Sequence, residues 1–295
     1  MNSLRRLLFA FVLVVLPLRA EDALVSKRTE VIYGRKFGTA LTLDVIQPVK
    51  PNGYGVCWMI SGGFFSSHDG INPDFVRPLL ARGYTVFAVV HGSQPKFAIP
   101  EITEDIHRAI RFVRHNAASY GVTPDKLGIF GSSAGGHLSL TMGTQGRPGP
   151  ADAKDAVDRE SSTVQAVAAF FPPTDFLNWD APGDDNVGVG RVGSQFKAAF
   201  GPRSDTPESR QMLGREISPI NFVTAQMTPT LILHGTADKL VPYRQAEIFV
   251  AKCKEVGAPV KLVPREDKDH GWPEMNKDLE LFADWYDTNL RGMKP

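Results

Sequence analysis

Short apolar runs alternate with amphipathic stretches along most of the chain. The apolar runs are continuous, as in strands that are covered on both faces of a sheet, and they lie at 56–60, 85–90, 127–130, 164–171, 230–233 and 260–263. Helical periodicity is found at 73–82, 101–120, 134–142, 243–256 and 274–290. Strands that alternate with helices predict an α/β fold, with a mostly parallel central sheet, helices on both faces and right-handed crossovers.

Two segments depart from this alternation in simple ways. Residues 30–36 and 41–46 alternate apolar with polar side chains, which predicts an edge hairpin that turns near Gly38. Residues 146–161 are rich in glycine, proline and charge, and they predict a surface loop.

A longer irregular segment lies at about 172–218. It contains scattered glycine, proline and charged residues and only short amphipathic pieces. We expect it to cover a pocket that Phe176 or Trp179 lines. An equal alternative is an ordinary surface excursion whose aromatic rings belong to the core.

The N-terminus is expected to lie outside the fold. Two arginines precede an apolar run at 7–16, and Ala20 is a candidate cleavage position. This pattern predicts a signal peptide at 1–20, because the run is short for a transmembrane helix. The remaining 21–295 would form a single domain, secreted or periplasmic, with no stable membrane insertion after cleavage. An uncleaved membrane anchor is the alternative.

The composition argues against a nucleic-acid partner and allows the two cysteines to be either free or paired. The chain has 295 residues, 42% hydrophobic and 22% charged, which is ordinary for a globular protein with one sizeable core. A formal charge of +1 indicates no nucleic-acid partner. Cys57 lies in a predicted central strand and Cys253 in a predicted surface helix. We expect free thiols, although an exported protein could pair them, and neither cysteine has the spacing of a metal site.

The clearest chemical motif is Gly-Ser-Ser-Ala-Gly at 131–135, between a predicted strand and a predicted helix. A Gly-x-Ser-x-Gly sequence in this context is typical of a nucleophile elbow, which exposes the hydroxyl of Ser133 above the sheet. Gly131 and Gly135 would keep side chains out of the sharp turn. The N–H of Ala134, at the start of the helix, could donate to a developing oxyanion.

A serine nucleophile needs a base, and the base needs a carboxylate to orient it. In an open α/β sheet these partners follow the carboxyl ends of later strands. Asp238 and His270 follow the last two apolar runs, and the order Ser133, Asp238, His270 is the one expected for this motif. Asp267 and Asp269 are alternatives to Asp238.

The other histidines have simpler explanations. His107 lies on the polar side of a predicted helix and is expected in solvent, whereas His137 is expected to pack beside the elbow. His91 follows a strand end and is expected to border the pocket. His234 shares a turn with Asp238 and is expected to support it.

Several segments together resemble the α/β-hydrolase superfamily. They are ISGGF, DIHRAIRFVRHNAASYGVTPDKLGIFGSSAGGHLS, SPINFV, and PTLILHGTADKLVPYRQAE with the later DHGW, and they cover most of 56–272. The chain is similar to the esterases related to hormone-sensitive lipase and to bacterial feruloyl and acetyl-xylan esterase-like proteins. The catalytic part of prolyl oligopeptidase-type enzymes is similar too. The resemblance implies an α/β-hydrolase fold.

The resemblance also implies an oxyanion loop after the first apolar run. The family often has His-Gly-Gly-Gly there, whereas this chain has Ser61-Gly62-Gly63-Phe64. We assign oxyanion or substrate contacts to Gly62, Gly63, Phe64 and Ala134, with the loop donors at Gly63 or Phe64. A backbone N–H needs no particular side chain, so the replaced glycine does not remove a donor.

The implied activity is hydrolysis of a carboxylic ester through an acyl-enzyme, with no cofactor and no metal. The substrate would be a small-molecule or polysaccharide-linked ester, and the acyl group, the alcohol and the oligomeric state stay open. One alternative is a serine peptidase of prolyl-oligopeptidase-like type, disfavoured because the chain has no room for the accompanying propeller domain. Another is a non-catalytic binding protein on a hydrolase scaffold, disfavoured because all three candidate triad residues are present.

Overall fold

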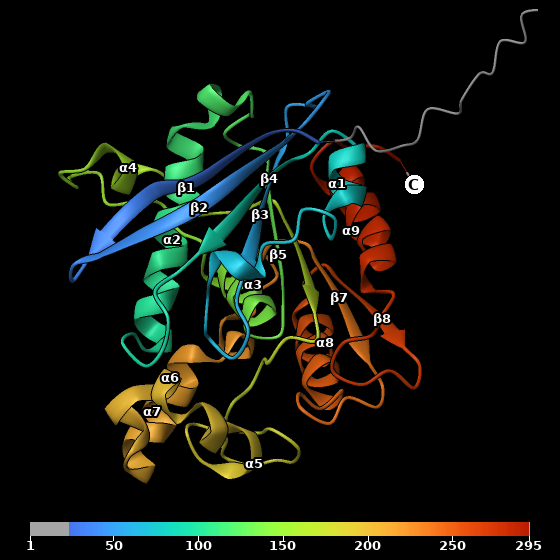
Figure 1. Cartoon of the computed structure of the whole chain (residues 1–295). Helices are drawn as coiled ribbons and strands as arrows, with labels where there is room; N and C mark the ends of the chain where they lie inside the picture. The colour runs from blue at the N-terminus through green and yellow to red at the C-terminus, as the bar shows by residue number, and fades with distance from the viewer. Residues whose placement is uncertain (1–23, 295) are drawn as a thin grey trace, which may run out of the picture.

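Within residues 24–294, which the computed structural model describes, eight strands form one sheet in the order β1-β2-β4-β3-β5-β6-β7-β8 (Figure 1). The strands are β1 (Leu24–Lys36), β2 (Thr39–Pro48), β3 (Gly55–Ile60), β4 (Thr85–Val90), β5 (Leu127–Ser132), β6 (Ala166–Phe170), β7 (Thr230–Gly235) and β8 (Val260–Arg265). The predicted signal peptide lies outside the described residues. No helix within 24–294 is both long enough and apolar enough to span a membrane.

The sheet is antiparallel at one edge and parallel elsewhere. β1 and β2 form a hairpin around Gly38, whose φ is 73°, and β2 then pairs antiparallel with β4. Every neighbouring pair from β4 to β8 is parallel. The sheet therefore has the α/β-hydrolase arrangement, and the predicted edge hairpin is confirmed.

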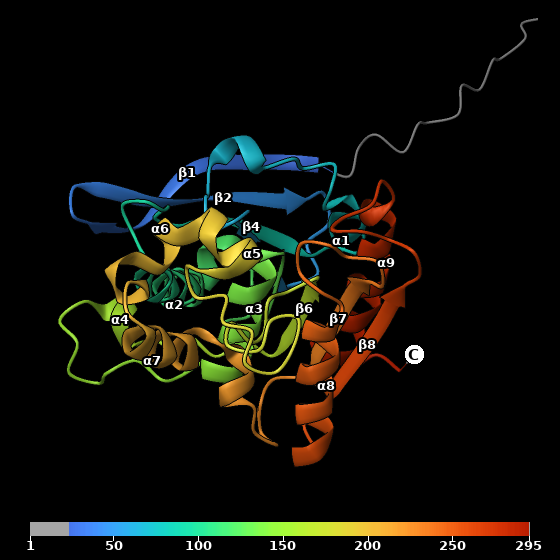
Figure 2. The same cartoon turned by 90° about the horizontal axis from the view of Figure 1, so that it is seen from below.

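Helices cover both faces of the sheet. The helices are α1 (Arg77–Ala81), α2 (Ile99–His115), α3 (Ala134–Gln145), α4 (Ala156–Arg159), α5 (Gly190–Gly193), α6 (Lys197–Phe200), α7 (Pro207–Ile217), α8 (Arg244–Val256) and α9 (Met275–Asn289). α1 and α9 lie on one face, and α2, α3 and α8 lie on the other (Figure 2). Alternate strand residues serve the two cores: Cys57 and Met59 pack under α2 and α3, and Val56 and Trp58 pack under α1 and α9.

The irregular segment between β6 and β7 carries α5, α6 and α7, which gather at one end of the sheet (Figure 1). Phe176 and Trp179 are each 2% exposed within it. Gln245, at the start of α8, fixes the base of the segment: its Oε1 accepts from the N–H groups of Thr174 and Asp175 (2.9 and 2.8 Å), and its Nε2 donates to the carbonyl of Trp179 (2.9 Å). The segment is thus attached to the fold by a buried amide.

Two predicted helices are shorter in the structure. α1 begins at Arg77 because the side chain of Asn72 accepts from the N–H of Asp74 (3.0 Å) and holds a turn in front of the helix. α2 ends at His115, and a separate 3-10 turn at Ala117–Tyr120 follows. In both cases a local turn takes backbone groups that a longer helix would need.

Two side chains expected near the surface are buried. His107 is fully buried, where its Nε2 accepts from Arg147 (2.6 Å) and its Nδ1 donates to Ser162 Oγ (2.7 Å). Burial, followed by the charge of Arg147, lowers the pKa of His107 to about 3. The prediction that His107 lies in solvent is wrong, because the segment after α3 folds over this side of α2. Cys253 is likewise buried, and it and Cys57 are free thiols.

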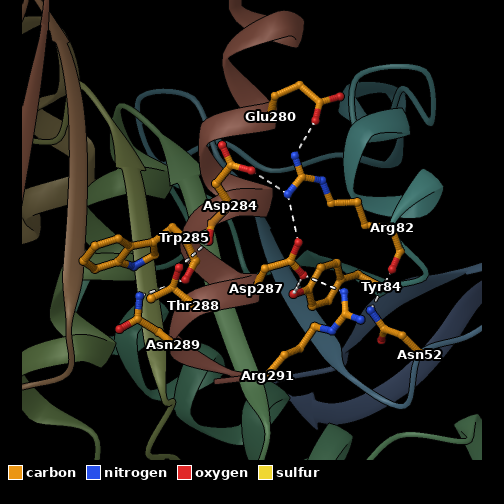
Figure 3. Close-up of polar contacts among 10 residues, drawn as sticks. All are labelled: Asn52, Arg82, Tyr84, Glu280, Asp284, Trp285, Asp287, Thr288, Asn289 and Arg291. Atoms are coloured by element: carbon orange, nitrogen blue, oxygen red, sulfur yellow. Dashed lines mark hydrogen bonds and ion pairs between the residues drawn. The ribbon is translucent and has the colours of Figure 1, made fainter. Parts of the chain in front are cut away.

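Ion pairs of Arg82 connect the last helix, α9, to the segment that follows α1 (Figure 3). The guanidinium of Arg82, just after α1, donates to Glu280 (2.8 Å), Asp284 (2.6 Å) and Asp287 (2.9 Å) of α9. The hydroxyl of Tyr84 donates to Asp287 as well (2.7 Å). Burial raises the pKa of Asp287, but hydrogen bonds from Tyr84 and the nearby arginines outweigh it, so the pKa lies below its usual value.

Replacing this arginine is expected to destabilise the fold. Arg82→Met should lower the free energy of unfolding by about 2 kcal/mol, because it leaves the partly buried Asp287 with fewer donors. Urea unfolding measures this. Lys252→Met is the control, since it removes an exposed pair with Glu255 (2.8 Å) and should cost less than about 0.5 kcal/mol. Equal effects of the two changes would contradict this role for Arg82.

Candidate active site

Ser133 stands at the sharp turn between β5 and α3. Its φ of 54° and ψ of −120° form a backbone conformation that residues with a side chain rarely adopt. A Cβ on Gly131 would lie 2.5 Å from the backbone of Gly135, and a Cβ on Gly135 would lie 2.5 Å from the carbonyl oxygen of Met59. Both glycines are therefore required for the turn to fit against β3. The N–H of Ser133 donates to the carbonyl of Phe170 (3.0 Å), which fixes the turn on β6.

Hydrogen bonds join Ser133 to His270 and His270 to Asp238. The Nε2 of His270 is 2.9 Å from Ser133 Oγ, and its Nδ1 is 2.8 Å from Asp238 Oδ2. Because the carboxylate can only accept, Nδ1 carries the proton and Nε2 is free to accept one. Asp269, an alternative orienting residue, instead accepts from the backbone N–H groups of His270 (2.8 Å) and Lys239 (2.9 Å).

The carboxylate of Asp238 is held in one orientation. Its Oδ1 accepts from the N–H groups of Leu240 and Val241 (2.9 Å each). Burial raises the pKa of Asp238, but hydrogen bonds from His234 and His270 outweigh it and lower the pKa to about 2. Asp238 is therefore ionised at neutral pH. His234 is fully buried and donates to the carbonyl of Val241 (2.8 Å), so it supports this turn as expected.

The loops that carry Asp238 and His270 lie against each other along the backbone. The N–H of Ala237 donates to the carbonyl of Lys268 (3.0 Å). A Cβ on Gly235 would lie 2.2 Å from the same carbonyl oxygen. Only glycine at the end of β7 allows this approach, which places the histidine beside its carboxylate.

The loop after β3 presents unpaired donors beside Ser133. The N–H of Gly62 donates to the carbonyl of Phe65 (3.0 Å), and the N–H of Phe65 donates back to Gly62 (2.9 Å). The N–H groups of Gly63, Phe64 and Ala134 have no hydrogen-bond partner in the part of the chain that the structure describes. Of the loop residues assigned from the sequence, Gly62 is thus not available as a donor, whereas Gly63 and Phe64 are.

Gln94 holds the carbonyl groups of this loop. Its side chain, in a residue that is 5% exposed, donates from Nε2 to the carbonyl of Gly63, and its own N–H donates to the carbonyl of Phe64 (3.2 Å). In a trans peptide the carbonyl and the next N–H point in opposite directions. Gln94 therefore sets the direction of the Phe64 N–H. The Phe65 N–H does the same for the N–H of Gly63 through the Gly62 carbonyl.

His91 supports the same loop from inside the protein. It is 4% exposed, donates from Nδ1 to the carbonyl of Gly92 (2.7 Å) and accepts at Nε2 from the hydroxyl of Ser61 (2.8 Å). Burial lowers its pKa to about 4. The carbonyl of Ser61 accepts from the N–H of Gly135 (3.2 Å), which joins the loop to the elbow. His91 thus supports the loop from behind, and it is not among the lining residues of the cavity beside Ser133 or of the groove beside Ser132.

A small, partly open cavity of about 60 Å³ lies beside Ser133. The irregular segment between β6 and β7 supplies much of its wall, including Phe176, Trp179, Val192, Phe196 and Phe200. Gly63, Phe64 and Ala134 complete it next to the serine. The side chain of Phe64 is 4% exposed and packs edge-on against His137, with 5.5 Å between ring centroids.

A larger, open groove of about 620 Å³ is also lined by residues of this loop. Trp58, Phe65 and Phe75 line it together with Ser132 and Gly62. Phe65 is 54% exposed there, and Trp58 is 6% exposed. The site therefore combines a small, confined space with a wide open groove that exposes the ring of Phe65.

Three residues near the site were missed by the sequence analysis. The ring of Phe171 lies 4.4 Å from the ring of His270, centroid to centroid. Its position directly after β6, at the carboxyl end of a parallel strand, was an available signal. Gln94 and Asn186 lie in irregular segments and carry no motif. Within residues 24–294 no group of three or more histidine, cysteine, aspartate or glutamate residues could hold a metal ion.

Comparison with known protein families shows the family to which this chain belongs. The family model described as BD-FAE matches residues 43–253, which is most of the chain. The chain belongs to the BD-FAE family. The matched region runs from β2 into α8 and contains Ser133 and Asp238, whereas His270 follows it.

Relatives of this BD-FAE protein include proteins named as esterases. It is 29% identical over 185 residues to Esterase LipQ of Mycobacterium tuberculosis, a match that covers 61% of this chain and 42% of the relative. It is 24% identical over 241 residues to a probable isoprenylcysteine alpha-carbonyl methylesterase, ICME, of Oryza sativa subsp. japonica, covering 81% and 57%. The chain thus spans about half the length of these relatives.

Solved structures with the same fold are also named as esterases. A truncated form of a carbohydrate esterase from gut microbiota is 25% identical and has a TM-score of 0.76, over 91% of this chain and 99% of that one. Thermogutta terrifontis esterase 2 with bound butyrate is 23% identical and has a TM-score of 0.67, over 90% and 95%. At that identity the second likeness concerns the fold alone.

Proposed function

We propose that this BD-FAE protein is a carboxylic ester hydrolase that works through an acyl-enzyme on Ser133. The observation that carries the proposal is the chain of hydrogen bonds from Ser133 to His270 (2.9 Å) and from His270 to Asp238 (2.8 Å). Unpaired N–H groups of Gly63, Phe64 and Ala134 lie beside the same serine. The esterase names of the relatives support this class of reaction.

In the first half-reaction Ser133 Oγ attacks the ester carbonyl carbon while its proton passes to Nε2 of His270. The carbonyl oxygen takes up the electron pair of the C=O π bond, and the N–H donors stabilise its negative charge. The ionised Asp238 stabilises the imidazolium. When the tetrahedral intermediate collapses, the bond to the alcohol oxygen breaks, and His270 gives its proton to that oxygen.

In the second half-reaction water attacks the acyl-enzyme. As the water oxygen bonds to the acyl carbon, His270 accepts a proton from the water. The bond between that carbon and Ser133 Oγ then breaks, and His270 returns the proton to the serine. One ester and one water give one carboxylic acid and one alcohol, and the enzyme regains its starting state.

The cavity beside Ser133 and the groove beside Ser132 suggest how the ester lies. A cavity of about 60 Å³ holds only a few water-sized groups, so we assign it to a short acyl chain. The open groove is assigned to the alcohol. The ring of Phe65, which is exposed in this groove, suits contact with a sugar ring, and the likeness to a carbohydrate esterase supports a polysaccharide-linked ester.

The proposal includes export. Residues 1–20 would act as a signal peptide, and 21–295 would form the mature single domain, secreted or periplasmic, with the segment at about 172–218 over the site. The positively charged start and the apolar run at 7–16 support this. An exported protein that begins at Met1 would contradict it.

The direct test uses a fluorophosphonate probe and a set of acetyl, butyryl, long-chain and feruloyl esters. The probe should label Ser133 once per chain, and Ser133→Ala should lower kcat by roughly 10⁴–10⁶-fold. Ser132→Ala, next in the chain, should be far milder. A protein that resists the probe and hydrolyses no ester would support the binding-protein alternative. Faster cleavage of peptide amides than of esters would support the peptidase.

The two neighbouring aspartates should differ sharply. Asp238→Asn should lower kcat by about 10³–10⁴-fold, because an amide favours the wrong tautomer of His270. Asp269→Asn should change kcat less than about tenfold, because the Asp269 carboxylate contacts backbone N–H groups and the exposed ammonium of Lys239 (3.8 Å) rather than the ring of His270. Steady-state kinetics on an acetyl ester measures kcat for the two variants. A larger loss at Asp269 would make it the orienting residue.

Gln94 should act on kcat through the direction of the Phe64 N–H. Gln94→Met keeps the length of the side chain but removes the donor, and it should lower kcat about tenfold with little change in KM. This is less than the roughly 10²–10³-fold loss expected when an oxyanion donor itself is removed.

Gln94→Glu is the matched variant, because a carboxyl group donates only when protonated. Burial raises a carboxyl pKa, so kcat relative to the wild type should fall as pH rises through that pKa. Variants in which KM alone changes, or in which the Gln94→Glu ratio is independent of pH, would contradict the role of Gln94.

A further inference from the structure

The wall of the cavity beside Ser133 is mostly apolar, but it contains one amide. Asn186 lies between β6 and α5, is 2% exposed, and lines the cavity together with Ser133 and the surrounding aromatic rings. An asparagine in such a wall is costly unless its donors and acceptor find partners.

The oxygen of the Asn186 amide has a hydrogen-bond partner, whereas its NH₂ group does not. The Oδ1 of Asn186 accepts from the N–H of Gly193 (2.9 Å), so Nδ2 is the group left over. Nδ2 has no hydrogen-bond partner among the described residues. It is not sealed in the protein, whereas the Nε1 of Trp179, in the same wall, is sealed. Because Asn186 lines the cavity and Nδ2 keeps accessible surface, we take Nδ2 to face the cavity.

The amide is held rigidly. The N–H of Asn186 donates to the carbonyl of Phe176 (2.7 Å), and its carbonyl accepts from the N–H of Gly188 (3.1 Å). A Cβ on Gly193 would lie 2.0 Å from the carbonyl oxygen of Asn186, so the chain crosses itself closely here. A donor fixed in this way cannot turn to another partner when a ligand enters.

We infer that Asn186 selects a short acyl group that carries a hydrogen-bond acceptor oxygen within its chain, such as an alkoxyacyl or hydroxyacyl group. This inference rests on the proposed function, because it assigns the cavity to the acyl chain. An all-carbon chain that fills the cavity displaces water from Nδ2 and leaves the donor unpaired. A site with a fixed donor discriminates against a substrate that lacks the acceptor.

Isosteric 4-nitrophenyl esters test the inference. Methoxyacetate and butyrate differ only in an ether oxygen for a methylene, and 3-methoxypropionate and pentanoate place that oxygen one atom further out. The measured quantity is the ratio of kcat/KM for the ether ester to that for the alkyl ester. Comparing the ratio between variants cancels the intrinsic reactivity of each ester.

Asn186→Leu should lower this ratio about fivefold to tenfold for at least one pair, the effect of one hydrogen bond. Asn186→Asp keeps an oxygen for the Gly193 N–H but turns an acceptor toward the ether, so it should lower the ratio at least as much. Trp179→Phe removes a sealed N–H from the same wall and should leave the ratio unchanged.

The outcomes separate the inference from the proposed function. Ratios that stay within about twofold in both Asn186 variants, in folded proteins that still hydrolyse the esters through Ser133, would mean that water alone uses Nδ2 and would overturn the inference. A ratio lowered by Trp179→Phe and not by the Asn186 changes would assign the donor to Trp179 and overturn it as well. Absence of all ester hydrolysis and of Ser133 labelling would overturn the proposed function itself. Circular dichroism confirms that each variant is folded.

Discussion

The backbone turn at Ser133 is the constraint on which the rest of the site depends. Its positive φ directs the side chain away from the sheet, and the turn is possible only because Gly131 and Gly135 let three backbone segments approach within contact distance. The same approach brings the N–H of Gly135 to the carbonyl of Ser61 (3.2 Å), so the elbow and the donor loop form one unit. A shift of either would separate the serine from its donors.

Peptide orientation explains how the donor loop tolerates its unusual sequence. Phe64 stands where relatives often have glycine, and its φ of 65° shows why glycine is favoured there. The conformation persists because the carbonyl groups of Gly63 and Phe64 accept hydrogen bonds from Gln94, and because the ring of Phe64 is buried against His137. Packing and hydrogen bonds offset the local strain, so the donor N–H does not depend on a glycine.

Burial and hydrogen bonding together set the charge of Asp238 and of His91. Asp238 is buried but surrounded by donors, so its pKa falls to about 2 and the carboxylate stays ionised. His91 is buried without an anionic partner, so its pKa falls to about 4 and the ring stays neutral. The carboxylate of Asp238 therefore contacts His270 as an anion, and the ring of His91 contacts the donor loop as a neutral group. In both cases the surroundings strengthen the charge state that the residue type favours at neutral pH.

The sequence by itself determined the fold class, the elbow and the order of Ser133, Asp238 and His270. Apolar periodicity and short glycine motifs are local signals, and the elbow is built from neighbours in the chain. Chain order favoured Asp238 and kept Asp267 and Asp269 as alternatives, because all three lie in loops. Only the tertiary structure showed which carboxylate contacts the ring of His270, and this is Asp238 (2.8 Å). Gln94, Asn186 and the burial of His107 were decided in the same way. Their roles arise from contacts with segments distant in sequence, and no local pattern encodes which backbone carbonyl, N–H group or cavity a single polar side chain will meet.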